Sequence, residues 1–217
     1  AVIGYEILLT RLFSIIQWHH FAYMVISMAL LGFGAAGSFV ALARAWLERH
    51  FIAAFGAGAA AFGVSAFGCF AIAQRVPFNP LEIAWGGWQL AWLPLIYLLL
   101  SAPFFFAASA ICLAFSRFKE RLGLLYRFDL IGAGLGAPLV VALLFLGPPV
   151  LSLKLLALAG VGAGALVVAP ALRRNSAGAL AALLLAAAVA LPLAAPGAWS
   201  ALRLSPYKGL SVALTAP

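Results

Sequence analysis

The sequence predicts an all-α, polytopic integral membrane protein with about seven transmembrane helices. Of its 217 residues, 66% are hydrophobic and 8% are charged, whereas soluble domains are about 45–50% apolar and about 25% charged. The apolar residues form continuous runs and do not alternate with polar ones, which favours helices over a β-barrel. This composition excludes a soluble enzyme, a secreted disulfide scaffold and a disordered tail for most of the chain.

Seven apolar runs approach the roughly 20 residues that a helix needs to cross a hydrocarbon core of about 30 Å. The chain opens directly on apolar residues, so we interpret the short first run as a segment cut inside its first membrane span. Pro94 and Pro103 predict kinks in the fourth run. The predicted spans are residues 1–16, 21–46, 51–73, 90–115, 124–146, 151–169 and 177–195.

Charged or proline-rich segments separate these spans. Residues 44–50 predict a tight charged turn, and residues 75–88, which lie close to several tryptophans, predict a connector in the headgroup layer. Residues 147–149, Gly-Pro-Pro, predict a short hairpin between helices. The composition changes near the end of the chain. We therefore divide it into a helical transmembrane domain, residues 1–196, and a linker leading into a further domain, residues 197–217.

The distribution of basic residues predicts the orientation. The loops after the second, fourth and sixth spans hold Arg44, Arg49, Arg117, Lys119, Arg121, Arg127, Arg173 and Arg174. The opposite side holds only Arg75, Lys154, Arg203 and Lys208. The richer side is expected in the cytoplasm. The excess of basic residues thus suits the lipid bilayer as the partner and does not require a nucleic acid.

Polar side chains inside the first span are the first candidate functional residues, because intramembrane polar groups are costly. At 100° per residue, Glu6, Thr10 and Gln17 share one helix face, and Arg11 points about 140° away from Glu6. This stripe must face protein or water. Two roles stay open for it, contact between helices and the lining of a substrate or proton path.

Asp129 is the other acidic residue that falls inside a predicted span. Arg11 either extends toward the membrane surface or pairs with an acidic residue of a neighbouring helix. Pairing it with Asp129 would lower the cost of burying both charges, and this pair is a testable hypothesis. No other set of side chains predicts a catalytic, cofactor or metal site. Cys69 and Cys112 lie in apolar runs and are interpreted as small buried hydrophobic residues.

The segment DLIGAGLG at residues 129–136 is similar to the turn with which methyltransferase-type folds hold S-adenosyl compounds. Such a turn follows a strand and is trailed by an acidic residue about 20 positions later, but no Asp or Glu follows Asp129. We interpret Gly132 and Gly136 as a ridge for helix packing, which also suits a homo-oligomer. Similar ridges are predicted at Gly32/Ala36 and Gly160/Gly164.

Several segments together resemble one family, the bacterial membrane proteins that carry a spermidine-synthase-like domain at their C-terminus, often described as fused transporter and spermidine synthase. The resemblance spans nearly the whole chain. The segments are YEILLTRLF at residues 5–13, HFAYMVIS at 20–27, LLGFG at 30–34, Tyr126 with DLIGAGLG at 129–136, and SPYKGL at 205–210.

The resemblance implies a multi-pass protein of the bacterial inner membrane. It implies that this chain anchors, and supplies substrate to, an aminopropyltransferase-like domain that follows residue 217 and binds an S-adenosyl compound. No catalytic, cofactor-binding or metal residue of that domain is expected within these residues. The alternative is a small-solute or polyamine transporter, or a channel-like protein, with Glu6, Arg11 and Asp129 in its pathway.

Overall fold

The structure is a computed structural model, and it describes residues 2–16, 21–76 and 87–172. The described chain forms helices and no strand, which confirms the predicted all-α class. The elements are α1 (Val2–Ile16), α2 (Phe21–Leu42), α3 (Arg44–Arg49), α4 (Phe51–Ala73), α5 (Gly87–Arg117), the 3₁₀ turn η2 (Lys119–Arg121), α6 (Leu122–Leu146) and α7 (Pro149–Leu172).

Five helical segments of the described chain are long and apolar enough to cross a membrane, which supports the membrane class. The predicted count of seven is not confirmed. The first predicted span is α1, whose 15 residues fall short of the roughly 20 that a crossing requires. The seventh, residues 177–195, lies outside the described residues, as does the linker 197–217. The five segments are Tyr23–Leu42, Phe51–Ala73, Gln89–Arg117, Lys119–Leu146 and Pro149–Ala169.

The boundary after the second span differs from the prediction. The sequence predicted a span to Trp46 that overlaps a tight charged turn at residues 44–50, but α2 ends at Leu42 and Arg44–Arg49 form a separate short helix, α3. Ala43 interrupts the helical dihedrals, with φ −93° and ψ 8°. Charged side chains begin at Arg44, so the apolar helix ends before the hydrophobic Ala45–Leu47 stretch that the predicted span included.

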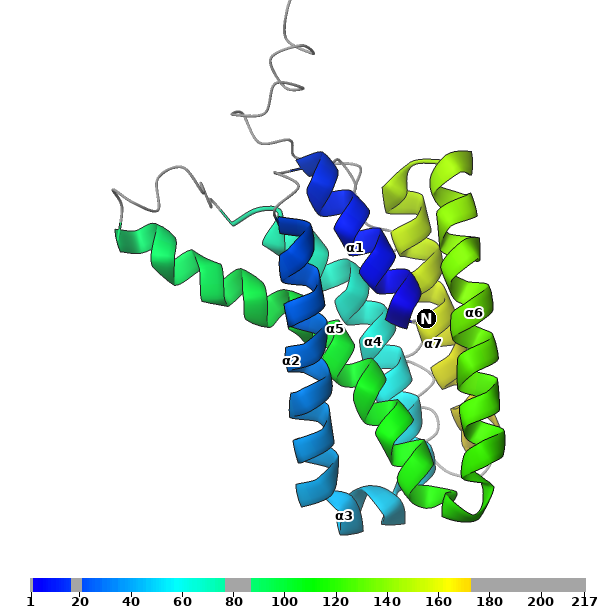
Figure 1. Cartoon of the computed structure of the whole chain (residues 1–217). Coiled ribbons are helices and arrows are strands. Elements are labelled where there is room, and N and C mark those ends of the chain that lie inside the picture. The colour runs from blue at the N-terminus through cyan, green and yellow to red at the C-terminus, as the bar shows by residue number, and fades with distance from the viewer. Residues whose placement is uncertain (1, 17–20, 77–86, 173–217) are drawn as a thin grey trace, which may run out of the picture.

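The other boundaries agree within a few residues. The third predicted span coincides with α4, and the Gly-Pro-Pro hairpin falls where α6 ends and α7 begins. Pro94 and Pro103 both lie inside the 31-residue helix α5. Figure 1 shows α5 changing direction along its length, which fits the predicted kinks because proline removes a backbone hydrogen bond from the helix.

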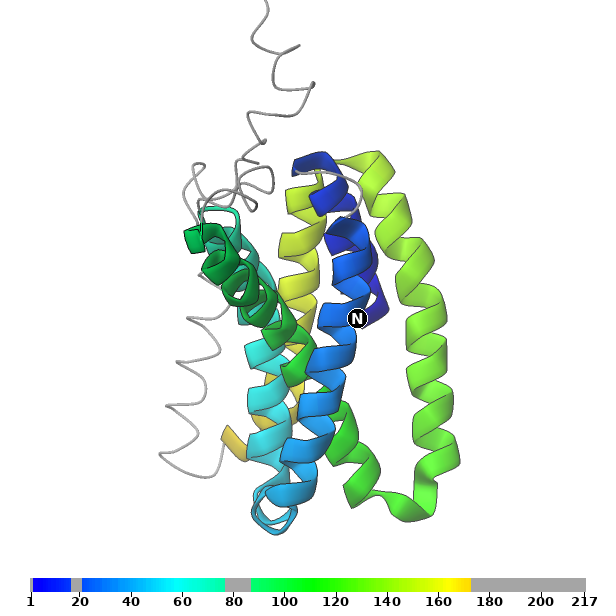
Figure 2. The same ribbon diagram turned by 60° about the vertical axis from the view of Figure 1, so that its left-hand side comes forward.

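The helices form a bundle around α4, which packs against α7 and against α5, and α5 also packs against α2. Helix α1 lies between these helices and α6, toward the end of the bundle away from α3 (Figure 1). Figure 2 shows α6 standing apart from the rest of the bundle, and its contacts are mainly with α1. Val140 is its one buried side chain in the part of the chain described.

Glycines allow α4 and α7 to lie in close contact. A β-carbon added to Gly160 of α7 would lie 3.1 Å from the Cα of Gly63, and one added to Gly164 would lie 2.7 Å from the carbonyl oxygen of Gly56. This confirms the predicted ridge at Gly160/Gly164. On α2, a β-carbon added to Gly32 would likewise lie 2.8 Å from the carbonyl oxygen of Ser101 of α5.

The glycine segment of residues 129–136 lies within α6 and forms no strand-to-helix turn. The predicted ridge is only partly present. A β-carbon on Gly4 of α1 would lie 3.6 Å from the carbonyl oxygen of Gly136, so Gly136 backs onto α1. A β-carbon on Gly132 would meet open space, so Gly132 makes no close contact with another described helix.

The core is centred on the side chains of α1. Tyr5 is fully buried, and its ring lies 6.0 Å from Phe62 of α4 and 5.1 Å from Phe104 of α5, measured between ring centroids. One helical turn further on, Leu8 and Leu9 are also fully buried. The first apolar segment of the sequence therefore supplies the centre of the bundle, although it is too short to count as a span.

Candidate functional site

The predicted polar stripe of α1 lies beside the buried face of that helix. Glu6 and Thr10, one turn apart, are half-buried, and Arg11 is exposed. Gln17, the third member of the stripe, lies outside the described residues. Glu6 and Thr10 therefore share one flank of α1, and the two roles considered for this stripe, contact between helices and lining of a path, stay predictions.

Asp129 lies on α6 and is exposed. The predicted pair of Arg11 and Asp129 is wrong: the one ion pair within the described ranges joins Arg44 to Glu48. Gly4 marks the register, because it contacts Gly136 of α6. Since α1 and α6 run in the same direction (Figure 1), Arg11 lies seven residues above this contact and Asp129 seven residues below. At about 1.5 Å per residue, the two side chains start about 20 Å apart along the bundle.

A polar cluster at one end of the bundle was not predicted from the sequence. The Arg44 Nε donates a hydrogen bond of 2.8 Å to Glu48 Oε1 on α3, and Ser116 Oγ of α5 donates one of 3.3 Å to the same oxygen. Arg44 and Glu48 stand at the (i, i+4) spacing that could have suggested their pairing. Ser116, 68 residues away in sequence, could not have been found that way.

The pKa of Glu48 is lowered from its ordinary value. The hydrogen bond from Arg44 is the largest cause, and the positive charge of Arg44, the Ser116 hydroxyl and the charge of Lys119 act in the same direction, against some desolvation. The carboxylate is therefore held in its charged form at neutral pH. Its hydrogen bonds connect α3 with the end of α5.

The same end of the bundle collects exposed basic side chains. Figure 1 shows α3 and the connection between α5 and α6 at one end, with the C-terminal end of α7 on the same side. The sequence predicted that the loops after the second and fourth spans share one side, and the structure places them so. The exposed basic residues here are Arg44, Arg49, Arg117, Lys119 and Arg121.

The buried hydroxyl of Tyr5 is a second feature that the sequence did not single out. This hydroxyl has no hydrogen-bond partner within residues 2–16, 21–76 and 87–172, and the Tyr5 side chain is fully enclosed. An unpaired buried hydroxyl costs about 1–3 kcal/mol. Tyr5 belongs to the segment YEILLTRLF. Its position next to Glu6 in an apolar run was the one feature of the sequence that could have drawn attention to it.

Metal-ligating chemistry finds no support in the described ranges, where no group of three or more His, Cys, Asp or Glu side chains could hold a metal ion. Cys69 and Cys112 are both free thiols, and both are partly buried, close to the interpretation made from the sequence. The polar groups that the structure brings together are thus the half-buried flank of α1 and the cluster around Glu48.

Comparison of the chain with models of known protein families, with curated proteins and with solved structures finds no match in any of the three.

Proposed function

We propose that this chain is the membrane domain of a spermidine-synthase-like protein of the bacterial inner membrane. It anchors a C-terminal S-adenosyl-type domain and supplies that domain with substrate. The proposal starts from the sequence resemblance described above. The geometry of α1 is the structural observation that favours it.

The segment YEILLTRLF, the first part of the resemblance, forms most of α1. Its residues Tyr5, Leu8, Leu9 and Leu12 are fully buried. A segment that fills the centre of a bundle is constrained by packing, since interiors are close-packed and sensitive to volume. The role of this segment is then to hold the helices together, as the framework of an anchor must.

The orientation of α7 also supports the proposal. The end of α7 lies at the end of the bundle that collects Arg49, Arg117 and Lys119 (Figure 1), and basic loops face the cytoplasm. A domain that uses an S-adenosyl compound requires access to the cytoplasm. The predicted span 177–195, which lies outside the described residues, would carry the C-terminus to the opposite side, so a cytoplasmic domain requires that one of the predicted spans does not cross.

A small-solute or polyamine transporter is the second candidate. The half-buried Glu6 and Thr10 on a central helix favour it, because an acidic group inside a membrane bundle suits a path for a cation. Asp129 does not lie beside them, since helix register offsets it along the bundle by about 13 Å from Glu6 and about 20 Å from Thr10. A pathway through all three predicted charges therefore has less support than one along α1.

Uptake of radiolabelled spermidine into proteoliposomes separates the two functions. Anchoring without supply of substrate predicts uptake no faster than in empty liposomes, and no difference between the wild-type protein and Glu6→Gln. Uptake that Glu6→Gln abolishes and Asp129→Asn preserves would instead establish transport along α1. Binding of an S-adenosyl compound by the native polypeptide, measured calorimetrically in detergent, is the positive result that anchoring requires.

A further inference from the structure

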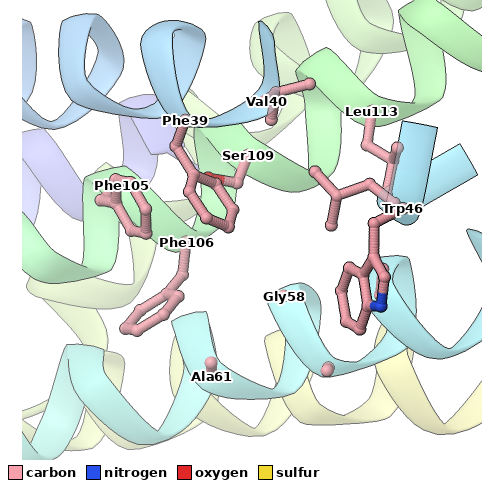
Figure 3. A pocket seen from close by; sticks show the side chains of 12 residues that line it. Phe39, Val40, Trp46, Gly58, Ala61, Phe105, Phe106, Ser109 and Leu113 are labelled. Carbon is pink, nitrogen blue, oxygen red and sulfur yellow. The ribbon is translucent and has the colours of Figure 1, made fainter. Parts of the chain in front are cut away.

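An apolar pocket opens between α2, α3, α4 and α5. Its volume is about 270 Å³, and aromatic and small side chains line it. Phe39 comes from α2, Trp46 from α3, Ala61 from α4 and Phe105 from α5, and Figure 3 shows these side chains around the open space. The rings of Phe39 and Phe105 lie 5.5 Å apart between centroids, so they form one wall together.

The pocket runs along the direction of the helices. On α5 it extends from Leu113, near the basic end, to Phe105, which is about 12 Å at 1.5 Å per residue. One leaflet of a bilayer contributes about 15 Å of hydrocarbon. The pocket therefore covers most of the depth of one leaflet, and its shape suits a single extended hydrocarbon chain.

Ser109 of α5 is a polar residue of this lining (Figure 3). The hydroxyl is buried and has no hydrogen-bond partner in the part of the chain that the structure describes. The rest of the lining is overwhelmingly apolar. A hydrocarbon chain forms no hydrogen bond with this hydroxyl, whereas a polar occupant would. Removing the hydroxyl in Ser109→Ala therefore distinguishes the two kinds of occupant in the test below.

Exposed basic side chains flank the end of the pocket beside α3, which we take as its mouth. Trp46 and Leu47 of the lining belong to α3, where Arg44 and Arg49 are exposed. The end of α5 contacts α3 at this place, because Ser116 donates a hydrogen bond to Glu48. Just after α5, the Phe118 ring lies 5.3 Å from the ring of Phe51, the first residue of α4, measured between centroids. Around this junction stand Arg44, Arg49, Arg117, Lys119 and Arg121, against the acidic Glu48 and Glu120.

We propose that this pocket holds one acyl chain of an anionic phospholipid, whose phosphate lies among the basic residues at the mouth. Lipid tails are as apolar as the lining, so the pocket fixes the position of the acyl chain but adds little preference for one lipid over another. The headgroup preference comes from the basic residues, which attract anionic lipids. Trp46 is 62% exposed and lies on α3 among the basic residues. Exposed tryptophans favour the headgroup layer, which is where the phosphate would lie. This inference does not depend on the function proposed above.

Native mass spectrometry of the detergent-purified protein tests the proposal, with phosphatidylglycerol and phosphatidylcholine of identical acyl chains as probes. We expect one phosphatidylglycerol retained per protein, in clear preference to phosphatidylcholine. Arg49→Gln and Arg117→Gln should each weaken this retention about five-fold. Equal retention of the two lipids by the wild-type protein would overturn the proposal.

Filling the pocket separates it from the surrounding annular lipid. Ala57→Leu and Ala61→Leu place larger side chains in the lining, and we expect them to reduce lipid retention at least ten-fold in combination. Ala53→Leu, on the exposed face of α4 outside the lining, is the matched control and should retain lipid as the wild type does. Unchanged retention by the filled variant would contradict the proposal, as would loss of retention in Ser109→Ala.

A measurement on the wild-type protein covers the case in which the filled variant fails to fold. Phosphatidylglycerol with a photoreactive diazirine in the middle of one acyl chain is incorporated into vesicles with the protein and illuminated. We expect peptides of α5 around Phe105–Leu113 and of α2 around Phe39 to carry most of the label. Labelling dominated by the exposed helix α6 would show annular contact only and would overturn the proposal.

Discussion

A β-carbon placed on Gly160 of α7 would lie 3.1 Å from the Cα of Gly63 on α4. That distance is shorter than about nine in ten real β-carbon contacts, so the two helices pack backbone to backbone at this level. Such packing matters in a membrane, where no hydrophobic effect drives helices together and close van der Waals contact must do so. The α4–α7 pair is therefore the part of the bundle most sensitive to a single added methyl group.

Gly63→Ala tests this sensitivity. The new methyl group would meet the carbonyl oxygen of Ala157 and lie 2.9 Å from the backbone nitrogen of Val161, so α7 must shift. We expect a loss of about 1–3 kcal/mol in the free energy of unfolding, the usual cost of overpacking. Unfolding by SDS in mixed micelles, followed by circular dichroism, measures it.

Gly68→Ala is the matched control, because it lies on the same helix and a β-carbon there meets open space. It should be neutral or stabilise the protein by up to about 1 kcal/mol, since alanine favours the helix. Equal effects of the two substitutions would contradict the close α4–α7 contact.

The hydroxyl of Tyr5 gives a second prediction. Because this hydroxyl is buried without a partner among the described residues, Tyr5→Phe should leave the free energy of unfolding unchanged or raise it by about 1 kcal/mol. Tyr5→Ala should lower it by about 3–5 kcal/mol, because the ring fills the core between Phe62 and Phe104. A marked loss in Tyr5→Phe would mean that the hydroxyl bonds a group outside the described chain.

The charge of Glu48 predicts a dependence on pH. Its pKa in the folded protein is lowered from 4.5, chiefly by the hydrogen bond from Arg44. Its contribution to stability is therefore complete above the unfolded pKa and is lost as the pH falls through the lowered folded value. Wild-type protein should lose stability relative to Glu48→Gln between about pH 5 and pH 3, and the two should converge in acid. Parallel curves across this range would contradict the role given to Glu48.

The absence of a pair between Arg11 and Asp129 is testable by charge reversal. Since helix register separates the two side chains by about 20 Å, Arg11→Glu and Asp129→Arg should act independently, and the double variant should express no better than the poorer single variant. Fluorescence-detected size exclusion of a tagged protein measures folded yield. Recovery of wild-type yield in the double variant would show that the two charges do meet.

The two ends of the bundle should differ in their access from outside the cell. In a background of Cys69→Ala and Cys112→Ala, we expect Pro148→Cys to react with an impermeant maleimide on intact cells. Glu120→Cys, at the basic end, should react only after the cells are permeabilised. The reverse pattern would place the basic end outside and remove the topological support for a cytoplasmic C-terminal domain.

Helix positions were largely predictable because long apolar runs end at charges or prolines, as α4 does between His50 and Arg75. The sequence placed the end of α2 too late, because the hydrophobic Ala45–Leu47 stretch extends the apolar pattern beyond Leu42, where the helix ends. Contacts between helices followed the glycine pattern only in part. Gly160 meets Gly63, whereas Gly132 meets no helix, because spacing alone does not show which ridge has a partner.

Candidate site residues were harder to predict. The free-energy cost of placing a charge in a membrane identified Glu6, Arg11 and Asp129 as unusual. Whether two of them pair depends on how far their helices are shifted along the bundle axis, which the composition of a sequence does not show. The register was set by the contact of Gly4 with Gly136. Similarly, the Glu48 cluster depends on Ser116 from the far end of α5. The pocket needs side chains from four separate helices, so no local motif could have marked it.

The most direct test of the central proposal is the intact mass of the native polypeptide, combined with sequencing downstream of Pro217. We expect the chain to continue for on the order of 200 residues, enough for a further domain, with a strand, a glycine-rich turn and a trailing acidic residue that would hold an S-adenosyl compound. A native polypeptide that ends at Pro217 would contradict the anchoring function and leave the polar flank of α1 as the candidate site.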